Sequence, residues 1–326
     1  MKPNVTVTHN FPEVALEKLR GRAEVYYNDS GNSLSPAELI DRAGKSDAIM
    51  SYLTDKIDAA VIDAGGDHLK IIANYGAGFN NIDFAHAQKK NIWVSNTPSV
   101  LHETTADLTW AMLLGIARRI VESDRFTREG KFHGWQGDMF LGGDVYGKTL
   151  GVIGCGEIGA AVARRALGFD MRVLYHQRTR LSEAEEKKLN ARFVSLDELL
   201  KESDFVTLHV PLTDATKHMI GRDQLAMMKP TAYLIHAARG KVVDDQALVD
   251  ALINKSIAGA ALDVFENEPA LTEGMTDLDN LIVLPHIGSA SVATRDTMAL
   301  LVVDNVFDAL DGKTPRTLIP GWPGQA

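Results

Sequence analysis

The chain has 326 residues, 45% hydrophobic and 24% charged, with a net charge of -9, which argues against a polyanion such as DNA as a partner. It contains no run of ~18 apolar residues and no apolar signal core at its N-terminus, so we expect neither a membrane span nor secretion. Its single cysteine, Cys155, cannot form an intrachain disulfide, which favours a cytoplasmic protein. The length predicts two domains.

Short apolar runs alternate with helical patterns over the first hundred residues. We predict strands at 5–7, 48–50, 70–73 and 92–94, and helices at 12–19, 36–43 and 83–90. A capping box at 35–38 opens the second helix, and Gly44 ends it. This rhythm predicts a parallel sheet with helices on both faces.

The strand–helix alternation is interrupted in the middle of the chain. An amphipathic helix is predicted at 104–120, followed by a polar, glycine-rich loop at 130–147. We expect the loop to wrap around another surface, such as a second subunit. Trp135 in this loop suits interface or core packing, and a wall of a substrate pocket is the alternative. Other candidate walls are Leu53, Met139 and Phe140.

A second α/β rhythm begins at residue 149. Its predicted strands are 152–153, 172–175, 205–209, 233–235, 258–262 and 281–284. The final predicted helix, 292–310, follows the last strand. If this helix crosses back to the first domain, that domain is discontinuous.

The stretch 150–159, LGVIGCGEIG, joins a predicted strand to a predicted helix through G-x-G-x-x-G. This is the pattern of a dinucleotide-binding turn. Gly154 permits the tight turn, Gly156 lets backbone approach a pyrophosphate, and Gly159 lets the helix pack closely on the strand. The helix N-terminus offers unpaired N–H groups to the pyrophosphate. A glycine-rich turn without a ligand is the alternative.

The end of the next strand bears on the choice of cofactor. NAD-binding units usually place an Asp or Glu there to bind the ribose 2′-hydroxyl. Residues 176–180, HQRTR, contain no carboxylate. The two arginines, Arg178 and Arg180, and the hydroxyl of Thr179 suit a 2′-phosphate instead, which favours NADP(H) and leaves NAD(H) possible. The alternative is that these arginines only cap a surface loop.

Three later segments each place chemistry just beyond a predicted strand: Arg239, Asp263 with Glu268, and His286. Ligands of doubly wound sheets bind outside the carboxyl ends of the strands, so we expect these residues to converge. An arginine can bind a carboxylate while a histidine beside an acid donates a proton, as reduction of an α-keto acid requires. Spacing alone leaves Glu266 possible as the acid, and Arg239 alone could form a structural ion pair.

Together, several segments resemble one known family, the D-isomer-specific 2-hydroxyacid dehydrogenases. The matching segments, in the family's order, are NYGAGFNNID (74–83), TTAD (104–107), GCGEIG (154–159), AARG (237–240), LDVFENEP (262–269) and PHIGSAS (285–291). The resemblance implies that His286 is the proton donor, Glu268 its partner and Arg239 the substrate clamp. It also implies that the amides of Ala77 and Gly78 hold the substrate carboxylate.

The resemblance extends to the cofactor. It implies that Asp263 holds the nicotinamide carboxamide, that Thr104 touches the phosphate or nicotinamide, and that Val210 and Pro211 flank the adenine. The full set of predicted cofactor-binding residues is Thr104, Gly154, Gly156, Glu157, Ile158, Gly159, Gln177, Arg178, Thr179, Val210, Pro211, Ala237, Asp263 and Gly288. No metal site is expected, because His209, His218 and His236 lack ligand-like spacing.

The implied architecture is a Rossmann domain (101–286) inserted into a flavodoxin-like substrate domain (1–100 plus 287–326), in a homodimer. Within the family, the basic segment at 176–180 and the short chain look most like glyoxylate/hydroxypyruvate reductases that use NADPH. One alternative is a D-lactate or phosphoglycerate type of dehydrogenase with NAD(P). Another is a non-catalytic dinucleotide sensor, similar to a corepressor, on the same scaffold.

Overall fold

The computed structural model describes residues 1–319, 321 and 322. The chain divides into two compact units. Unit 1 comprises Met1–Leu101 and Ser289–Ala326, and unit 2 comprises His102–Gly288. In the described residues, no helix is long and apolar enough to cross a membrane.

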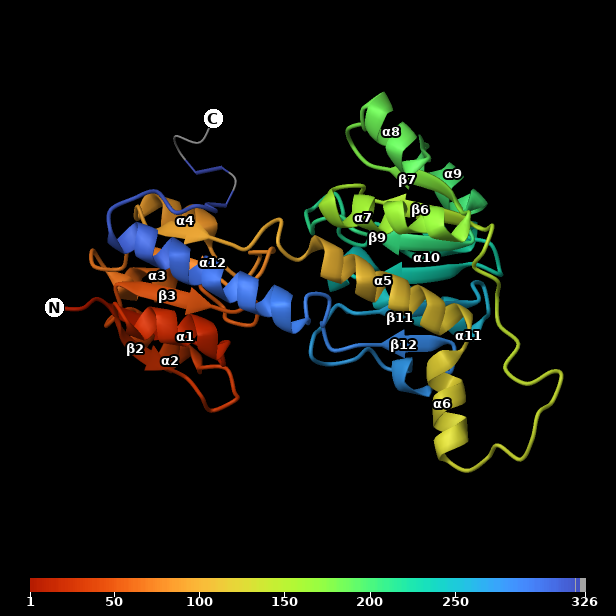
Figure 1. Cartoon of the computed structure of the whole chain (residues 1–326), viewed down its shortest axis with the longest axis horizontal. Helices are drawn as coiled ribbons and strands as arrows, with labels where there is room; N and C mark the ends of the chain where they lie inside the picture. The colour runs from red at the N-terminus through yellow and green to blue at the C-terminus, as the bar shows by residue number, and fades with distance from the viewer. Residues whose placement is uncertain (320, 323–326) are drawn as a thin grey trace. The chain divides into compact units, whose positions relative to one another are not determined.

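Unit 1 is a five-stranded parallel sheet covered by helices (Figure 1). Its strands are β1 (Asn4–Val7), β2 (Glu24–Tyr27), β3 (Ala48–Ser51), β4 (Ile71–Asn74) and β5 (Trp93–Ser95). Its helices are α1 (Glu13–Arg20), α2 (Pro36–Ala43), α3 (Ala59–Gly65), α4 (Phe84–Lys89) and α12 (Val292–Leu310). The strand order β2-β1-β3-β4-β5 is that of flavodoxin-like sheets.

Alternating side chains of these strands supply two cores, one on each face of the sheet. Val7 and Met50 pack against α1 and α12, and Ile49 and Ile72 pack against α2, α3 and α4. The period of two along a strand explains why Ile49 and Met50 point to opposite faces. Because α12 supplies Val302 and other buried residues to the first core, the C-terminal segment is part of unit 1.

Unit 2 is a seven-stranded parallel sheet, also covered on both faces. Its strands are β6 (Thr149–Ile153), β7 (Arg172–His176), β8 (Ala191–Phe193), β9 (Phe205–Leu208), β10 (Tyr233–His236), β11 (Gly259–Leu262) and β12 (Leu281–Val283). Its helices are α5 (His102–Ala117), α6 (Ile120–Arg128), α7 (Glu157–Ala166), α8 (Glu183–Leu189), α9 (Leu196–Glu202), α10 (Arg222–Met227) and α11 (Asp245–Ile253), with short 3-10 turns η1 (Leu167–Phe169), η2 (Gly240–Val242) and η3 (Met275–Asp277).

The strand order of unit 2 is β12-β11-β10-β9-β6-β7-β8. Successive strands are added toward one edge of the sheet from β6 to β8 and toward the other edge from β9 to β12, so the order reverses between β6 and β9. Such a reversal is the switch point at which doubly wound sheets bind ligands, outside the carboxyl ends of their strands. The order is that of a Rossmann sheet with one further strand at its edge. The predicted class, two doubly wound parallel sheets of Rossmann and flavodoxin-like type, is therefore confirmed.

The predicted helices and strands are present, with one correction and several omissions. The single helix predicted at 104–120 is wrong, because Arg119 adopts a left-handed φ of 54° and separates α5 from α6. The edge strands β2 and β8 escaped prediction, since their side chains are partly exposed and form no apolar run. Residues 130–147 form no helix or strand, as predicted.

Candidate active site

The glycine turn after β6 has the backbone geometry that its sequence requires. Gly154 has a φ of 88°, and a Cβ there would lie 2.8 Å from the carbonyl carbon and oxygen of His209. A Cβ on Gly159 would lie 2.0 Å from the Gly154 oxygen, so α7 packs against the turn only with glycine at this position. A Cβ on Gly156 would meet no atom within 4 Å. The first and third glycines therefore serve the fold, and the second faces open space.

The N-terminus of α7 fits the phosphates of a dinucleotide. Its N-cap residue, Gly156, provides no side-chain cap for the first turn. A helix of ten residues carries partial positive charge at this end, where backbone N–H groups lack helical acceptors. Open space beside Gly156 lets an anion reach these groups, which is the arrangement of dinucleotide-binding turns.

Cys155 lies inside this turn and fills space. The side chain is buried, and burial raises the pKa of its thiol to about 11. At neutral pH the group is therefore a protonated thiol, which is a poor nucleophile.

The two arginines of the predicted cofactor segment, which follows β7, differ in their contacts. Gln177 accepts the Cys155 N–H at 2.9 Å and donates to the Thr179 carbonyl at 2.6 Å, so it ties this segment to the glycine turn. Arg180 donates twice to Glu186, at 2.9 and 2.8 Å, and holds the pKa of Glu186 at about 2. The exposed Arg178 has no partner among the residues that the structure describes.

Beyond β9, the chain passes close to the glycine turn. The site that a Cβ on Gly154 would occupy lies 2.8 Å from Cγ1 of Val210. Pro211 follows, and its carbonyl accepts the Thr216 hydroxyl at 2.6 Å. The two predicted adenine-flanking residues are thus at the switch point between β6 and β9.

His286 and Glu268 form a hydrogen-bonded pair beyond β12 and β11. Nδ1 of His286 lies 2.8 Å from Oε2 of Glu268, and each side chain keeps about a third of its surface exposed. The Phe265 N–H donates to Oε1 of Glu268 at 3.2 Å. Burial opposes ionisation of Glu268, but His286, this N–H and Arg239 outweigh it and lower its pKa below the usual value.

Asp263 holds the turn that carries His286. His286 has a left-handed φ of 55°, a costly conformation for a residue other than glycine. Its N–H donates to the Asp263 carbonyl at 3.0 Å, and the N–H groups of Ile287 and Gly288 donate to the two carboxylate oxygens at 2.7 Å each. Asp263 is buried, and burial raises its pKa above the usual value.

Arg239 lies at the start of η2, directly after β10. Its Nη1 donates to the Ala238 carbonyl at 2.6 Å. Desolvation lowers the pKa of its guanidinium below the usual value, although the charge of Glu268 acts in the opposite direction. The next residue must be glycine, because a Cβ on Gly240 would lie 2.0 Å from the Phe265 oxygen. This close approach fixes the Arg239 turn against the loop that carries Glu268.

In unit 1, the loop after β4 carries the two amides predicted to bind a carboxylate. Ala77 and Gly78 are half-buried, and their N–H groups have no acceptor among the described residues. The Asn96 side-chain amide donates to the Ala77 carbonyl, and that of Asn74 donates to the Gly78 carbonyl, each at 2.7 Å. The loop thus presents unpaired donors while its carbonyls are occupied.

Comparison with known proteins agrees with this arrangement. The model of the D-isomer-specific 2-hydroxyacid dehydrogenase NAD-binding domain matches residues 110–288. A glyoxylate reductase of Thermococcus onnurineus is 49% identical over 323 residues, 98% of this chain and 96% of the relative. The chain belongs to the D-isomer-specific 2-hydroxyacid dehydrogenases. It is an oxidoreductase that binds a nicotinamide dinucleotide and acts as a 2-hydroxyacid dehydrogenase.

Solved structures resemble this dehydrogenase over its whole length. A glyoxylate reductase from Paecilomyes thermophila is 32% identical, with a TM-score of 0.87 and 98% of each chain covered. An NADPH-dependent glyoxylate/hydroxypyruvate reductase from Sinorhizobium meliloti, in complex with NADP and malonate, is 32% identical, with a TM-score of 0.86 over 99% of this chain and 98% of that one. The predictions of the family and of an enzyme are confirmed.

The structure places the remaining predicted residues of this dehydrogenase individually. Thr104 is in the first turn of α5, and Glu157 and Ile158 are in the first turn of α7. Ala237 follows β10 and is half-buried. A Cβ on Gly288 would lie 3.2 Å from a carboxylate oxygen of Asp263. The roles assigned to all these residues stay predictions.

Two of the three histidines that lack ligand-like spacing, His209 and His236, have buried ring nitrogens. Burial lowers the pKa of His209 to about 3 and that of His236 to about 4, so both rings are neutral. His236 nevertheless contacts the site, since its Nε2 lies 3.0 Å from the Arg239 carbonyl. The sequence around His236 does not indicate this hydrogen bond to the Arg239 carbonyl. No group of three or more potential metal ligands occurs among the described residues.

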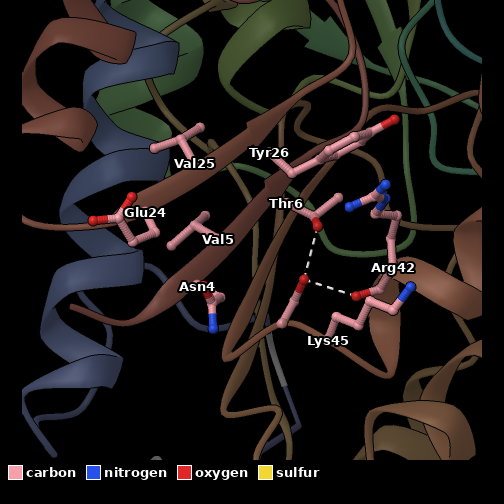
Figure 2. A pocket seen from close by; sticks show the side chains of 9 residues that line it. Asn4, Val5, Thr6, Glu24, Val25, Tyr26, Arg42 and Lys45 are labelled. Atoms are coloured by element: carbon pink, nitrogen blue, oxygen red, sulfur yellow. Dashed lines mark hydrogen bonds between the residues drawn. The ribbon is translucent and has the colours of Figure 1, made fainter. Parts of the chain in front are cut away.

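A pocket of about 380 Å³ lies elsewhere, in unit 1 (Figure 2). It is formed by β1, β2 and the end of α2, where Thr6 and Ser46 share a hydrogen bond of 2.7 Å. The Arg42 guanidinium lies 3.4 Å from the centre of the Tyr26 ring. None of the predicted site residues lines this pocket.

The glycine turn allows structural and ligand-binding roles to be separated. We expect Gly159→Ala to destabilise unit 2 strongly, because its Cβ collides with backbone. Gly156→Ala should change stability by less than about 1 kcal/mol. It should raise the dissociation constant for the dinucleotide about tenfold or more, by holding phosphate away from the amides. Thermal unfolding and cofactor fluorescence titration measure both effects, and equal stability losses in the two variants would contradict this assignment.

Proposed function

We propose that this dehydrogenase reduces glyoxylate or hydroxypyruvate to the D-2-hydroxy acid with NADPH. The observation that carries the proposal is the 2.8 Å hydrogen bond between His286 and Glu268, at the same edge of the sheet as Arg239 and the glycine turn. Relatives named glyoxylate reductase match 98% of the chain and support the choice of substrate.

His286 is the proton donor in this proposal. Glu268 is charged at neutral pH because its pKa is lowered, and it accepts a hydrogen bond from the N–H at Nδ1 of the ring. The other ring nitrogen, Nε2, then gives its proton to the carbonyl oxygen of the keto acid. Bound NADPH supplies the hydride that adds to the carbonyl carbon.

Two groups hold the substrate carboxylate in this proposal. The Arg239 guanidinium binds it and polarises the adjacent carbonyl. The amides of Ala77 and Gly78 donate to it, since their N–H groups have no acceptor in the part of the chain that the structure describes. Asp263 holds the turn that contains His286 through its three acceptor atoms. A contact between Asp263 and the nicotinamide carboxamide is a second proposed role.

Preference for NADPH rests on the end of β7. The exposed Arg178, without a partner among the described residues, offers a cation for a 2′-phosphate, and residues 176–180 contain no carboxylate to repel the phosphate. Gln177 and Thr179 lie beside it on the segment tied to the glycine turn. The NADPH-dependent reductase of Sinorhizobium meliloti, which resembles this chain, supports the same choice.

We also propose a homodimer joined through α6 and the loop that follows it. This segment exposes a series of apolar side chains that a monomer would leave in water: Ile120, Val121, Phe132, Trp135, Leu141 and Tyr146. Trp135 is 86% exposed, although an aromatic ring of this size is usually covered. Figure 1 shows α6 and the loop extending away from the sheet of unit 2.

Turnover tests the proposed reaction. With NADPH, we expect reduction of glyoxylate and hydroxypyruvate at higher kcat/KM than of pyruvate or 3-phosphohydroxypyruvate, measured by nicotinamide absorbance. His286→Ala should lower kcat/KM by a factor on the order of 10²–10⁴ through loss of the proton donor. His68→Ala, at an exposed histidine of unit 1, should match wild type. Wild-type rates in His286→Ala would refute the mechanism.

Arg178→Ala tests the cofactor assignment. Loss of a cation that binds the 2′-phosphate should raise the KM for NADPH about tenfold or more and leave the KM for NADH nearly unchanged. Arg180→Ala is the matched control, because Arg180 is already paired with Glu186 and should discriminate little. Equal changes for both cofactors in Arg178→Ala would rule out this contact.

Sedimentation equilibrium tests the dimer. We expect twice the chain mass at micromolar concentration, and a shift toward monomer when Trp135 and Leu141 are both replaced by Asp. Ile253→Asp is the control, since Ile253 is also 59% exposed in unit 2 but lies outside this segment. A monomeric wild-type protein would exclude the proposed assembly.

A further inference from the structure

The carbonyls of the 76–78 loop are held by three different donors. The Thr97 N–H donates to the Gly76 carbonyl at 3.0 Å. The side-chain amide of Asn96 donates to the next carbonyl, that of Ala77, and the amide of Asn74 to that of Gly78, at 2.7 Å each. All three donors come from the carboxyl ends of β4 and β5, where Ala73 pairs with Ser95.

Holding a carbonyl also orients the N–H of the following residue. In a trans peptide, the C=O and N–H of one planar unit point in opposite directions. The three held carbonyls therefore turn the N–H groups of Ala77, Gly78 and Phe79 away from Thr97, Asn96 and Asn74, respectively. None of these three N–H groups has an acceptor within the described part of the chain.

The asparagine side chains are themselves fixed. Oδ1 of Asn74 accepts the Ser51 hydroxyl at 3.0 Å and the Asn81 amide at 3.3 Å, which leaves its NH₂ group for Gly78. Asn96 is anchored through its backbone, which accepts the Thr317 hydroxyl at 2.7 Å and donates to the Thr317 carbonyl at 3.1 Å. Asn74 is fully buried and Asn96 is 6% exposed, so water competes little for these bonds.

Among the residues that the structure describes, the buried Oδ1 of Asn96 has no hydrogen-bond partner. Such an orphaned oxygen is unfavourable, and an apolar or smaller residue would avoid it. Within the same residues, only the NH₂ group of the side chain has a bonded partner, the Ala77 carbonyl. The bond to the loop is therefore what an asparagine supplies at this position.

We infer that Asn74 and Asn96 are positioning residues that set three consecutive amides, those of Ala77, Gly78 and Phe79, as donors to the carboxylate of the substrate. This inference rests on the proposed function, and it adds the Phe79 N–H and both asparagines to the carboxylate site. Three fixed donors favour a planar anion, because their orientation is set before it binds.

Asn96→Asp tests the positioning, because it replaces the NH₂ donor by an oxygen of similar size. We expect the KM for glyoxylate to rise about tenfold to a hundredfold, with little change in the KM for NADPH. Asn28→Asp is the matched control: Asn28 is also 6% exposed in unit 1 and donates to two carbonyls, those of Thr8 and Asn32, at 2.8 Å each. Equal KM values for glyoxylate in the two variants would overturn the inference.

A measurement on the wild-type protein covers the case in which Asn96→Asp does not fold. The ¹⁵N-labelled protein, saturated with NADP⁺, is titrated with the keto-acid analogue oxamate. We expect saturable shifts of the Ala77, Gly78 and Phe79 amide resonances. Absence of these shifts at saturating oxamate would overturn the three-donor site. Failure of the wild-type protein to reduce any 2-keto acid would instead refute the proposed function, so the two failures are distinguishable.

Discussion

One buried carboxylate, that of Asp263, supports the chemistry of this dehydrogenase. Three acceptor atoms of this residue hold three successive N–H groups of the turn that contains His286. Without them, the left-handed backbone of a histidine would relax toward a commoner conformation. Because Glu268 lies five residues beyond Asp263 in the same chain segment, one strand end fixes both members of the pair that we propose donates the proton.

The parallel sheet of unit 2 provides the common frame. Its strands all end at one edge, so residues far apart in the chain meet there: the glycine turn after β6, Arg239 after β10, Asp263 after β11 and His286 after β12. Close backbone packing at Gly240 holds the Arg239 turn against the segment after Asp263, and packing at Gly154 holds the glycine turn against the backbone of His209. Arg178, which has no partner among the described residues, is left available for a ligand.

Sequence reasoning succeeded where local patterns carry the information. Apolar runs located the strands with buried faces, and the pattern at 292–310 predicted α12 with its observed bounds. It failed at Arg119, where neither glycine nor proline marks the break between two helices, and at the partly exposed edge strand β2. The motifs that we propose as catalytic could be located in the sequence because each follows a strand. The bonds of Asn74, Asn96 and His236 could not, since each depends on contacts made in the folded chain.

The account depends most on one claim, that the hydrogen bond with Glu268 holds His286 in place as the proton donor. The kcat for glyoxylate reduction in Glu268→Gln tests it, because glutamine keeps the size of the side chain but replaces the carboxylate that bonds Nδ1 of His286. We expect kcat to fall about tenfold or more, since a proton donor that is held less firmly transfers its proton more slowly. The same kcat in variant and wild type would contradict the account.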